Sequence, residues 1–165
     1  MVHEEFNKFV SDYSQKVLRT AYGVLGDHQS AMDVHQEVFL AIWKRWKRFD
    51  ETTNWDGYLY RTTVRKSLEL ARKIRKEKSL NPETEKTIPS VSNPESSARA
   101  GELVAILRQY MQKLPAQQAQ AFVLSRVEGL EYPQIAAAMG CSEGTARVHL
   151  HRALKFLAHE MRDVL

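Results

Sequence analysis

The chain has 165 residues, a length that allows one ordinary domain or two very small ones and excludes a large multi-domain enzyme. It has 24 Lys and Arg against 20 Asp and Glu, a formal net charge of +4, and 43% hydrophobic residues, as in ordinary globular chains. Gly and Pro number only 7 and 5, whereas residues that lose little freedom in a helix are plentiful. The composition favours an all-α fold.

The N-terminal part of the chain predicts three helices, or four if a short one is added. Apolar residues recur at spacings of three and four from Phe6 to Val24, and Gly26 follows as a stop signal. A second helix is predicted from about Ser30 to Arg48, and a third from about residue 54 to residue 76. Because this segment is short, its core has to come from helices that pack on one another. Residues 1–78 therefore predict a small helical domain without room for a deep substrate pocket.

Residues 79–98 differ from the sequence on either side. They hold three of the five prolines and many serines, and they lack helical periodicity. This composition predicts a flexible linker between two domains. The alternative is an ordered loop folded over one domain, since structureless loops longer than about 15 residues are uncommon within compact domains.

Residues 99–165 predict four further helices and a second domain. One helix ends before Pro115 and another ends at Gly129. A short helix then ends at Gly140, and Ser142 is a good N-cap for a long last helix. A short helix, a tight turn with glycine and a longer helix form the helix-turn-helix pattern, whose second helix reads the major groove of DNA.

The last predicted helix has a polar and basic face opposite its buried stripe. Arg152 and Lys155 suit phosphates or guanine edges, Thr145 suits a phosphate, and Val148 suits a thymine methyl group. The alternative is a solvated helix face that happens to be basic. The short helix and turn before it favour duplex DNA.

The third predicted helix combines arginines with aromatic rings. Arg61, Arg65 and Arg72 fall on one side, near Tyr58, and Trp55 stands at the helix start. Exposed rings beside cations indicate a site for single-stranded nucleic acid, because unpaired bases stack on flat side chains. The alternative is that Trp55 and Tyr60 are core residues and the basic stripe is merely solvated.

The second predicted helix has an apolar residue on its polar side. Leu40 lies there with Trp43 at the edge, among Asp33, Gln36 and Glu37. A lone exposed leucine needs no explanation, but a leucine and a tryptophan ringed by charged side chains indicate a partner-binding patch with a polar rim.

Several of these strings, taken together and in order, carry a family likeness. They are Asp33-Val34-His35-Gln36-Glu37-Val38-Phe39, Tyr58-Leu59-Tyr60-Arg61, Leu114-Pro115, Val127-Glu128-Gly129-Leu130, Ile135-Ala136, Gly144-Thr145 and Leu150-His151-Arg152-Ala153. Over nearly the whole chain they resemble the bacterial sigma factors of the extracytoplasmic-function (ECF) group, within the sigma-70 family. The resemblance implies a sigma-two domain at about 1–78 and a helix-turn-helix sigma-four domain at about 99–165.

The resemblance also assigns roles, as expectations. Core RNA polymerase, through the clamp helices of its largest subunit, is expected to contact Asp33, Gln36, Glu37 and Leu40. The minus-ten promoter element, melted and single-stranded, is expected to contact Trp55, Tyr58, Arg61, Arg65 and Arg72. The duplex minus-thirty-five element is expected to contact Ser142, Thr145, Arg147, Val148, His151, Arg152 and Lys155. The sigma-four domain is also expected to bind the polymerase flap.

The chain departs from the family pattern at several of these places. His35 stands where a small aliphatic residue is usual, and Arg65 stands where Asn is common. Val148 and His149 replace a common Ser-Arg pair, so promoter preference is expected to differ. Glu131 replaces the usual Ser or Thr before the short helix, which is expected to weaken that cap.

Enzyme chemistry has little support in the sequence. The histidines are scattered without metal-ligand spacing, and no phosphate-binding glycine loop or activated nucleophile is present, so we expect no catalysis, metal or cofactor. The single Cys141 is either a redox switch or a small residue in a tight turn, and its isolation indicates a reducing compartment. No apolar run approaches the roughly 20 residues of a membrane span.

These observations leave two functional hypotheses. The first is a cytoplasmic sigma factor, held inactive by an anti-sigma factor that is often membrane-bound. The second is an ordinary helix-turn-helix regulator that binds duplex DNA as a dimer. The second hypothesis gives no use to Leu40, Trp55 or Tyr58.

Overall fold

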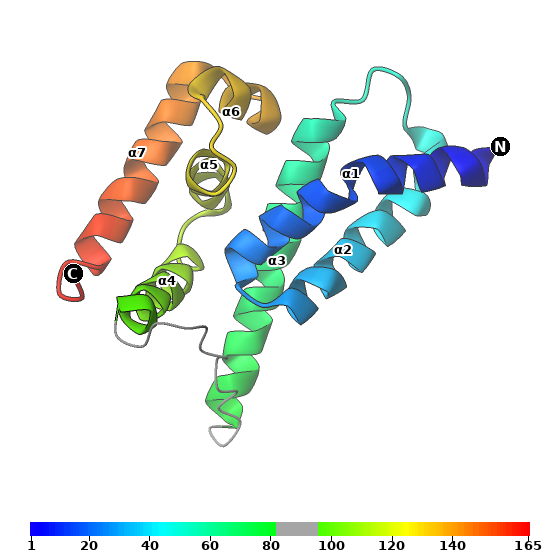
Figure 1. The fold of residues 1–165 in the computed structure, drawn as a ribbon. Helices are drawn as coiled ribbons and strands as arrows, with labels where there is room; N and C mark the ends of the chain where they lie inside the picture. The colour runs from blue at the N-terminus through cyan, green and yellow to red at the C-terminus, as the bar shows by residue number, and fades with distance from the viewer. Residues whose placement is uncertain (82–95) are drawn as a thin grey trace.

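A computed structural model describes residues 1–81 and 96–165 of the chain. Within these ranges the chain forms α-helices and one 3-10 helix and has no strand, which confirms the all-α fold. Figure 1 shows the helices in two groups. The first, which we call the N-terminal bundle, consists of α1 (Val2–Leu25), α2 (His28–Trp43) and α3 (Trp55–Leu80). The second, the C-terminal bundle, consists of α4 (Ser96–Met111), α5 (Ala116–Arg126), α6 (Tyr132–Met139) and α7 (Glu143–Glu160).

The boundary between α1 and α2 follows from two adjacent residues. Gly26 has a left-handed backbone, with φ of 69°, and its N–H donates to the carbonyl of Tyr22, a common way for a helix to end. Asp27 then caps α2, because its carboxylate accepts from the Ser30 N–H at 2.9 Å. The helix therefore begins at His28, earlier than predicted.

The second predicted helix was also wrong at its far end. The structure ends α2 at Trp43 and places a separate 3-10 helix at Trp46–Arg48. Helix α3 begins where predicted, because the Asn54 side chain accepts from the Gly57 N–H at 3.0 Å.

Regular helix extends into the predicted linker from both sides. Helix α3 continues to Leu80, and α4 already begins at Ser96. The rest of the predicted linker, residues 82–95, lies outside the described residues.

The helix-turn-helix forms as predicted from α6 and α7. Gly140 has a φ of 67° and ends α6, and the Ser142 hydroxyl accepts from the Thr145 N–H at 3.1 Å to begin α7. Glu131 was expected to be a weak cap for α6, and the structure shows a second hydrogen bond at this cap that the sequence analysis did not predict. The Gln134 side chain accepts from the Glu131 N–H at 3.0 Å, so one end of this cap is completed by a residue three positions later.

Helix α3 is buried on two sides, and this arrangement joins the two bundles. Leu59 belongs to the core between α1 and α2. Val64 and Leu68 belong instead to a core that they share with residues of α5 and α7, and Tyr60 packs with residues of α6. The C-terminal bundle thus packs directly on the N-terminal bundle along α3 (Figure 1).

Among the described residues, no helix combines the length and the apolar character needed to cross a membrane.

Candidate functional site

The outward face of α2 carries the residues expected to contact polymerase. Leu40 keeps 52% of its surface exposed. Asp33, Gln36 and Glu37 are also exposed and lie on the two preceding turns. We call these four residues the α2 patch. An apolar side chain with a polar rim is the composition of a protein interface.

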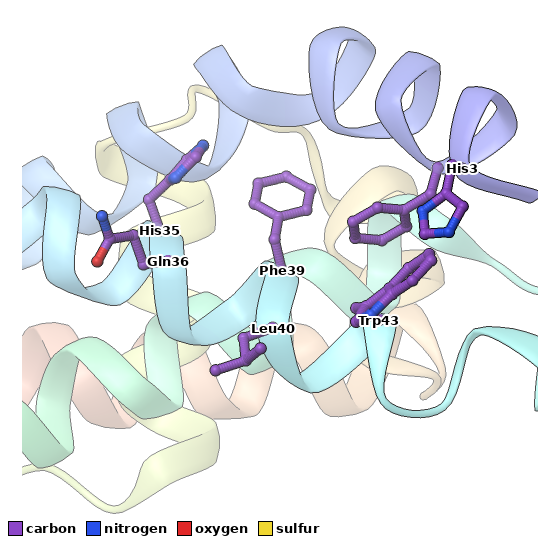
Figure 2. Close-up of a pocket in the computed structure, with 7 residues that line it drawn as sticks. His3, His35, Gln36, Phe39, Leu40 and Trp43 are labelled. Atoms are coloured by element: carbon purple, nitrogen blue, oxygen red, sulfur yellow. The ribbon is translucent and has the colours of Figure 1, made fainter.

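A groove of about 550 Å³ runs between α2 and the N-terminal turn of α1, next to the α2 patch. Its lining is mostly apolar and consists of His3, Phe6, His35, Gln36, Phe39, Leu40 and Trp43. In Figure 2, Phe39 points toward α1 and Leu40 points away from it. Trp43 is half-buried, with ring centroids 5.0 Å from His3 and 4.8 Å from Phe6. The sequence reading placed Trp43 at the patch edge but did not predict that α1 forms the other wall.

His35 is a half-buried residue of the groove lining, and it contacts α1. The Ser14 hydroxyl and the His35 Nε2 are 2.6 Å apart, which ties α1 to α2. Burial lowers the pKa of His35 below its ordinary value, because a charged imidazolium loses its hydration there.

The aromatic residues at the start of α3 are less exposed than the sequence reading assumed. The Trp55 ring is half-buried, with its centroid 4.4 Å from Phe9 and 4.7 Å from Phe49. Tyr58 is also half-buried and meets the Phe49 ring edge-on at 5.3 Å. Tyr60 is buried, as the alternative reading held. The Trp55 and Tyr58 rings are therefore parts of a packed aromatic cluster and are only partly exposed.

Two of the three arginines expected to bind single-stranded DNA contact the C-terminal bundle. Arg61 Nη1 donates to the carbonyl of Ala138 at 2.8 Å. Arg72 donates twice to the carbonyl of Gln112, from Nε at 3.1 Å and from Nη2 at 3.0 Å. Arg65 is exposed, and its nearest carboxylate is Glu69 at 4.0 Å. We call these three residues the α3 basic face.

The residues expected to read duplex DNA all lie on the surface of α7 or at its cap. They are Ser142, Thr145, Arg147, Val148, His151, Arg152 and Lys155, and all are exposed. Two of them also have structural roles: Ser142 caps the helix, and the Arg147 guanidinium lies 4.1 Å from the centre of the Tyr132 ring. In Figure 1, α5 lies between α7 and α3. We call this surface the α7 face.

A buried carboxylate joins the bundles, and the sequence reading did not single it out. The Glu128 side chain is 1% exposed. It accepts from Arg19 Nη2 at 2.8 Å and from the Thr20 hydroxyl at 2.6 Å. We call Arg19, Thr20 and Glu128 the Glu128 cluster. Nearby, Arg108 Nε donates to the Gly23 carbonyl at 3.2 Å, and burial lowers the pKa of this arginine.

The sequence feature that could have predicted this contact between the bundles lies in α3. Val64 and Leu68 are apolar and one turn apart, on a side of the helix that the core with α1 and α2 does not use. A second apolar side on an amphipathic helix indicates a second packing partner.

The described residues contain no cluster of side chains suited to a metal ion. Cys141 is partly buried and packs beside the core formed by α6 with Tyr60 and Ala146, so a packing role fits its position.

The fold and these surfaces define a helix-turn-helix protein with an additional helical bundle. Residues 9–77 match the family described as Sigma-70 region 2, and residues 105–157 match the family described as Sigma-70, region 4. The chain is 30% identical over 164 residues to the ECF RNA polymerase sigma factor SigE of Mycolicibacterium smegmatis, a match that covers 97% of this chain and 61% of that relative. It is 29% identical over 171 residues to the ECF RNA polymerase sigma-E factor of Escherichia coli K12, covering 97% of this chain and 88% of that relative. The chain belongs to the ECF group of the sigma-70 family.

Two solved structures share the fold. One is CnrH in complex with the cytosolic domain of CnrY, with a TM-score of 0.62 and 20% identity, covering 98% of this chain and 90% of that chain. The other is the sigma factor RpoE in complex with the anti-sigma factor NepR from Bartonella quintana, with a TM-score of 0.55 and 21% identity, covering 96% and 98%.

Proposed function

We propose that this protein is a promoter-specificity factor that binds core RNA polymerase, directs it to particular promoters and initiates transcription there. The observation that carries the proposal is the presence of two different surfaces on one chain. The α2 patch is apolar with a polar rim, whereas the α7 face belongs to a helix-turn-helix and is basic. These surfaces lie in the segments that match sigma-70 regions 2 and 4.

The α2 patch is proposed to contact the clamp helices of the largest polymerase subunit. Leu40 supplies the apolar centre of the contact, and Asp33, Gln36 and Glu37 supply hydrogen-bond acceptors and charge at its rim. The polar and charged rim around this exposed leucine supports the role, because an apolar centre within a polar rim is the composition of a protein interface.

The two bundles are proposed to engage promoter DNA in different forms. The α7 face enters the major groove of the duplex minus-thirty-five element, with Arg152 and Lys155 directed at phosphates or guanine edges. The C-terminal bundle also contacts the polymerase flap. The α3 basic face, with the partly exposed rings of Trp55 and Tyr58, holds the melted strand of the minus-ten element.

An anti-sigma factor is proposed to control the protein. The two structurally similar proteins were each solved with a bound partner, and for RpoE that partner is named as an anti-sigma factor. The proposal places the protein in the cytoplasm with its polymerase, and a membrane-bound inhibitor would hold it at the membrane. All bond-making chemistry in transcription then belongs to the polymerase.

The test is direct reconstitution. The purified protein is mixed with core RNA polymerase from the same cells, and co-elution on size exclusion is followed by run-off transcription from genomic fragments. We expect a stoichiometric complex and initiation at a discrete set of sites. A chain that fails to bind core polymerase at low salt but binds duplex DNA as a dimer would contradict the proposal and support the regulator hypothesis.

A further inference from the structure

The guanidinium of Arg147 lies over an aromatic ring from the neighbouring helix. Its central carbon is 4.1 Å from the centre of the Tyr132 ring, well within the distance of about 6 Å at which a cation is attracted to a ring face. Arg147 is exposed on α7, and Tyr132 is the first residue of α6. This contact therefore links the side chains of the two helices that form the helix-turn-helix.

A different partner for Arg147 is present on its own helix, and the structure does not use it. Glu143 precedes Arg147 by four residues, the spacing and order at which a glutamate and an arginine pair on a helix surface. Of the described residues, Glu143 forms no ion pair with Arg147, whose guanidinium lies on the ring instead. Contact with a ring face uses none of the five N–H donors of an arginine, so a ligand can still bind them.

The start of α6 holds the Tyr132 ring in place. The ring packs against the core that includes residues of α5 and α7. The Gln134 side chain accepts from the Glu131 N–H at 3.0 Å, and Pro133 follows Tyr132 in the first turn, where the fixed φ of proline suits a helix. Because the backbone is fixed on both sides of Tyr132, the ring is a rigid surface for the long side chain of Arg147.

The position of Arg147 on α7 suits a phosphate rather than a base edge. With about 100° between successive residues, Arg147 falls between the buried stripe at Ala146 and the centre of the α7 face at Lys155. Its contact with Tyr132 shows that this flank of α7 faces α6. In a helix-turn-helix bound to DNA, the second helix lies in the major groove and the first helix crosses the backbone. A guanidinium between the two helices then meets the phosphates at the edge of the groove.

From these observations we propose that Tyr132 is a positioning residue for DNA recognition, which holds the guanidinium of Arg147 ready for a phosphate of the duplex minus-thirty-five element. A free arginine side chain loses rotational freedom when it binds a phosphate, and this loss weakens binding. Here the ring orders the side chain before DNA binds. Phosphates are present at every base pair, so the contact raises affinity without selecting a sequence. The inference rests on the proposed function for the role of the α7 face.

The first experiment measures the order of the Arg147 side chain in the full-length chain without DNA. Nitrogen-15 relaxation of the side-chain Nε–H groups reports motion on the picosecond-to-nanosecond timescale. Arg152, which is exposed on the same helix, is the internal reference. We expect a clearly higher heteronuclear NOE for Arg147 than for Arg152, and Tyr132→Leu should lower the Arg147 value to that of Arg152. Equal values in the parent protein overturn the proposal.

The second experiment measures binding of the full-length chain to a labelled pool of short mixed-sequence duplexes, by fluorescence anisotropy over a range of salt concentrations. Arg147→Ala should weaken binding and reduce the slope of log affinity against log salt by about 1, as for the loss of one phosphate contact. Tyr132→Leu should weaken binding about two- to tenfold, the usual cost of ordering one flexible side chain. It should leave the slope unchanged, because the phosphate contact still forms.

A double-mutant cycle and two further variants separate positioning from stability. Adding Tyr132→Leu to Arg147→Ala should weaken binding no further, because the residue that the ring positions is gone. Tyr132→Phe keeps the ring face and should restore most of the affinity lost in Tyr132→Leu. Tyr110→Leu is the matched control, since Tyr110 packs against the same core and has the Lys113 ammonium 5.0 Å from its ring centre, but lies on α4. It should leave duplex binding unchanged, whatever its effect on the thermal midpoint.

The outcomes distinguish this inference from the proposed function. Additive losses in the cycle, or a Tyr132→Phe variant as weak as Tyr132→Leu, overturn the positioning role even if duplex binding depends on Arg152 and Lys155. If replacing Arg147, Arg152 and Lys155 with Ala leaves duplex binding unchanged, the α7 face does not bind DNA, and that part of the proposed function fails together with the inference. If Tyr132→Leu does not fold, the comparison of Arg147 with Arg152 in the parent protein still decides, because it needs no substitution.

Discussion

At the scale of single residues, His35 gives the N-terminal bundle a dependence on pH. Its Nε2 is 2.6 Å from the Ser14 hydroxyl, and burial lowers its pKa. A charged imidazolium loses its hydration on burial, so the folded chain favours the neutral imidazole. The unfolded chain therefore binds a proton more readily than the folded chain does.

We predict that stability falls on acidification through the ordinary pKa of histidine. The contribution of His35 is fully present above about pH 6.5, the value in an unfolded chain, and is lost as the pH falls through that value toward the lower folded pKa. The thermal midpoint, measured at about pH 7.5 and about pH 5.5, should drop more in the parent than in His35→Gln, whose amide does not titrate and keeps a polar partner for Ser14. Equal drops in both proteins would show that other groups carry the effect.

Leu40 provides a residue-level test of the polymerase contact. Leu40→Asp should weaken binding to core polymerase by on the order of 2 kcal/mol or more, the usual loss for a central interface residue. It should leave the thermal midpoint unchanged, because the side chain is already 52% exposed.

Val104→Asp is the control for this prediction, since Val104 is 42% exposed on α4 and lies outside the α2 patch. If Leu40→Asp instead unfolds the bundle, Leu40 is part of the core and the patch has been misidentified.

At the scale of helices, apolar spacing and capping residues predicted most of the structure. The stripes from Phe6 to Val24 and from Ala146 to Leu157 correspond to α1 and α7, because these spacings place side chains on one side of a helix. The two ends of α2 were harder to predict from the sequence. Asp27 and Ser30 are both acceptable N-caps, and which of them is used depends on where the left-handed Gly26 turns the chain.

The α7 face provides an element-level prediction. Replacing both Arg152 and Lys155 with Ala should weaken duplex binding and reduce the slope of log affinity against log salt by about 2, roughly one for each phosphate contact removed. The measurement is a salt titration by fluorescence anisotropy on a promoter fragment. The same change at Arg162, exposed beyond the end of α7, should leave the slope unaltered; if it lowers the slope equally, the effect is one of net charge.

At the scale of the whole molecule, the sequence predicted two helical units but not their mutual placement. The bonds between the bundles end largely on main-chain carbonyls, those of Gly23, Gln112, Ala137 and Ala138. Every residue has a main-chain carbonyl. The pattern of side chains therefore does not indicate which carbonyl accepts a hydrogen bond from a distant arginine. The hydrogen bonds from Arg61 and Arg72 to these carbonyls could not be read from the helical wheel for the same reason.

The shared core predicts cooperative unfolding. Val64 and Leu68 of one bundle belong to the same core as Leu150 and Leu157 of the other, so the two bundles should melt together in a single calorimetric transition. Gly23→Ala should split this into two transitions, because a Cβ on Gly23 would lie 2.4 Å from the Val127 Cγ1 and would force the two bundles apart. Two transitions already in the parent would contradict a core shared by the two bundles.

The C-terminal bundle has to pack on α3 and also to recognise DNA, and the use of main-chain acceptors makes these two requirements independent of each other. Arg61 and Arg72 hold peptide oxygens that remain whatever side chains those positions carry. The exposed residues of α7 can therefore be substituted during evolution, which changes the DNA preference, while the contacts with α3 remain. Promoter preference can therefore diversify among descendants of this chain without changes in the contact between the N-terminal and C-terminal bundles.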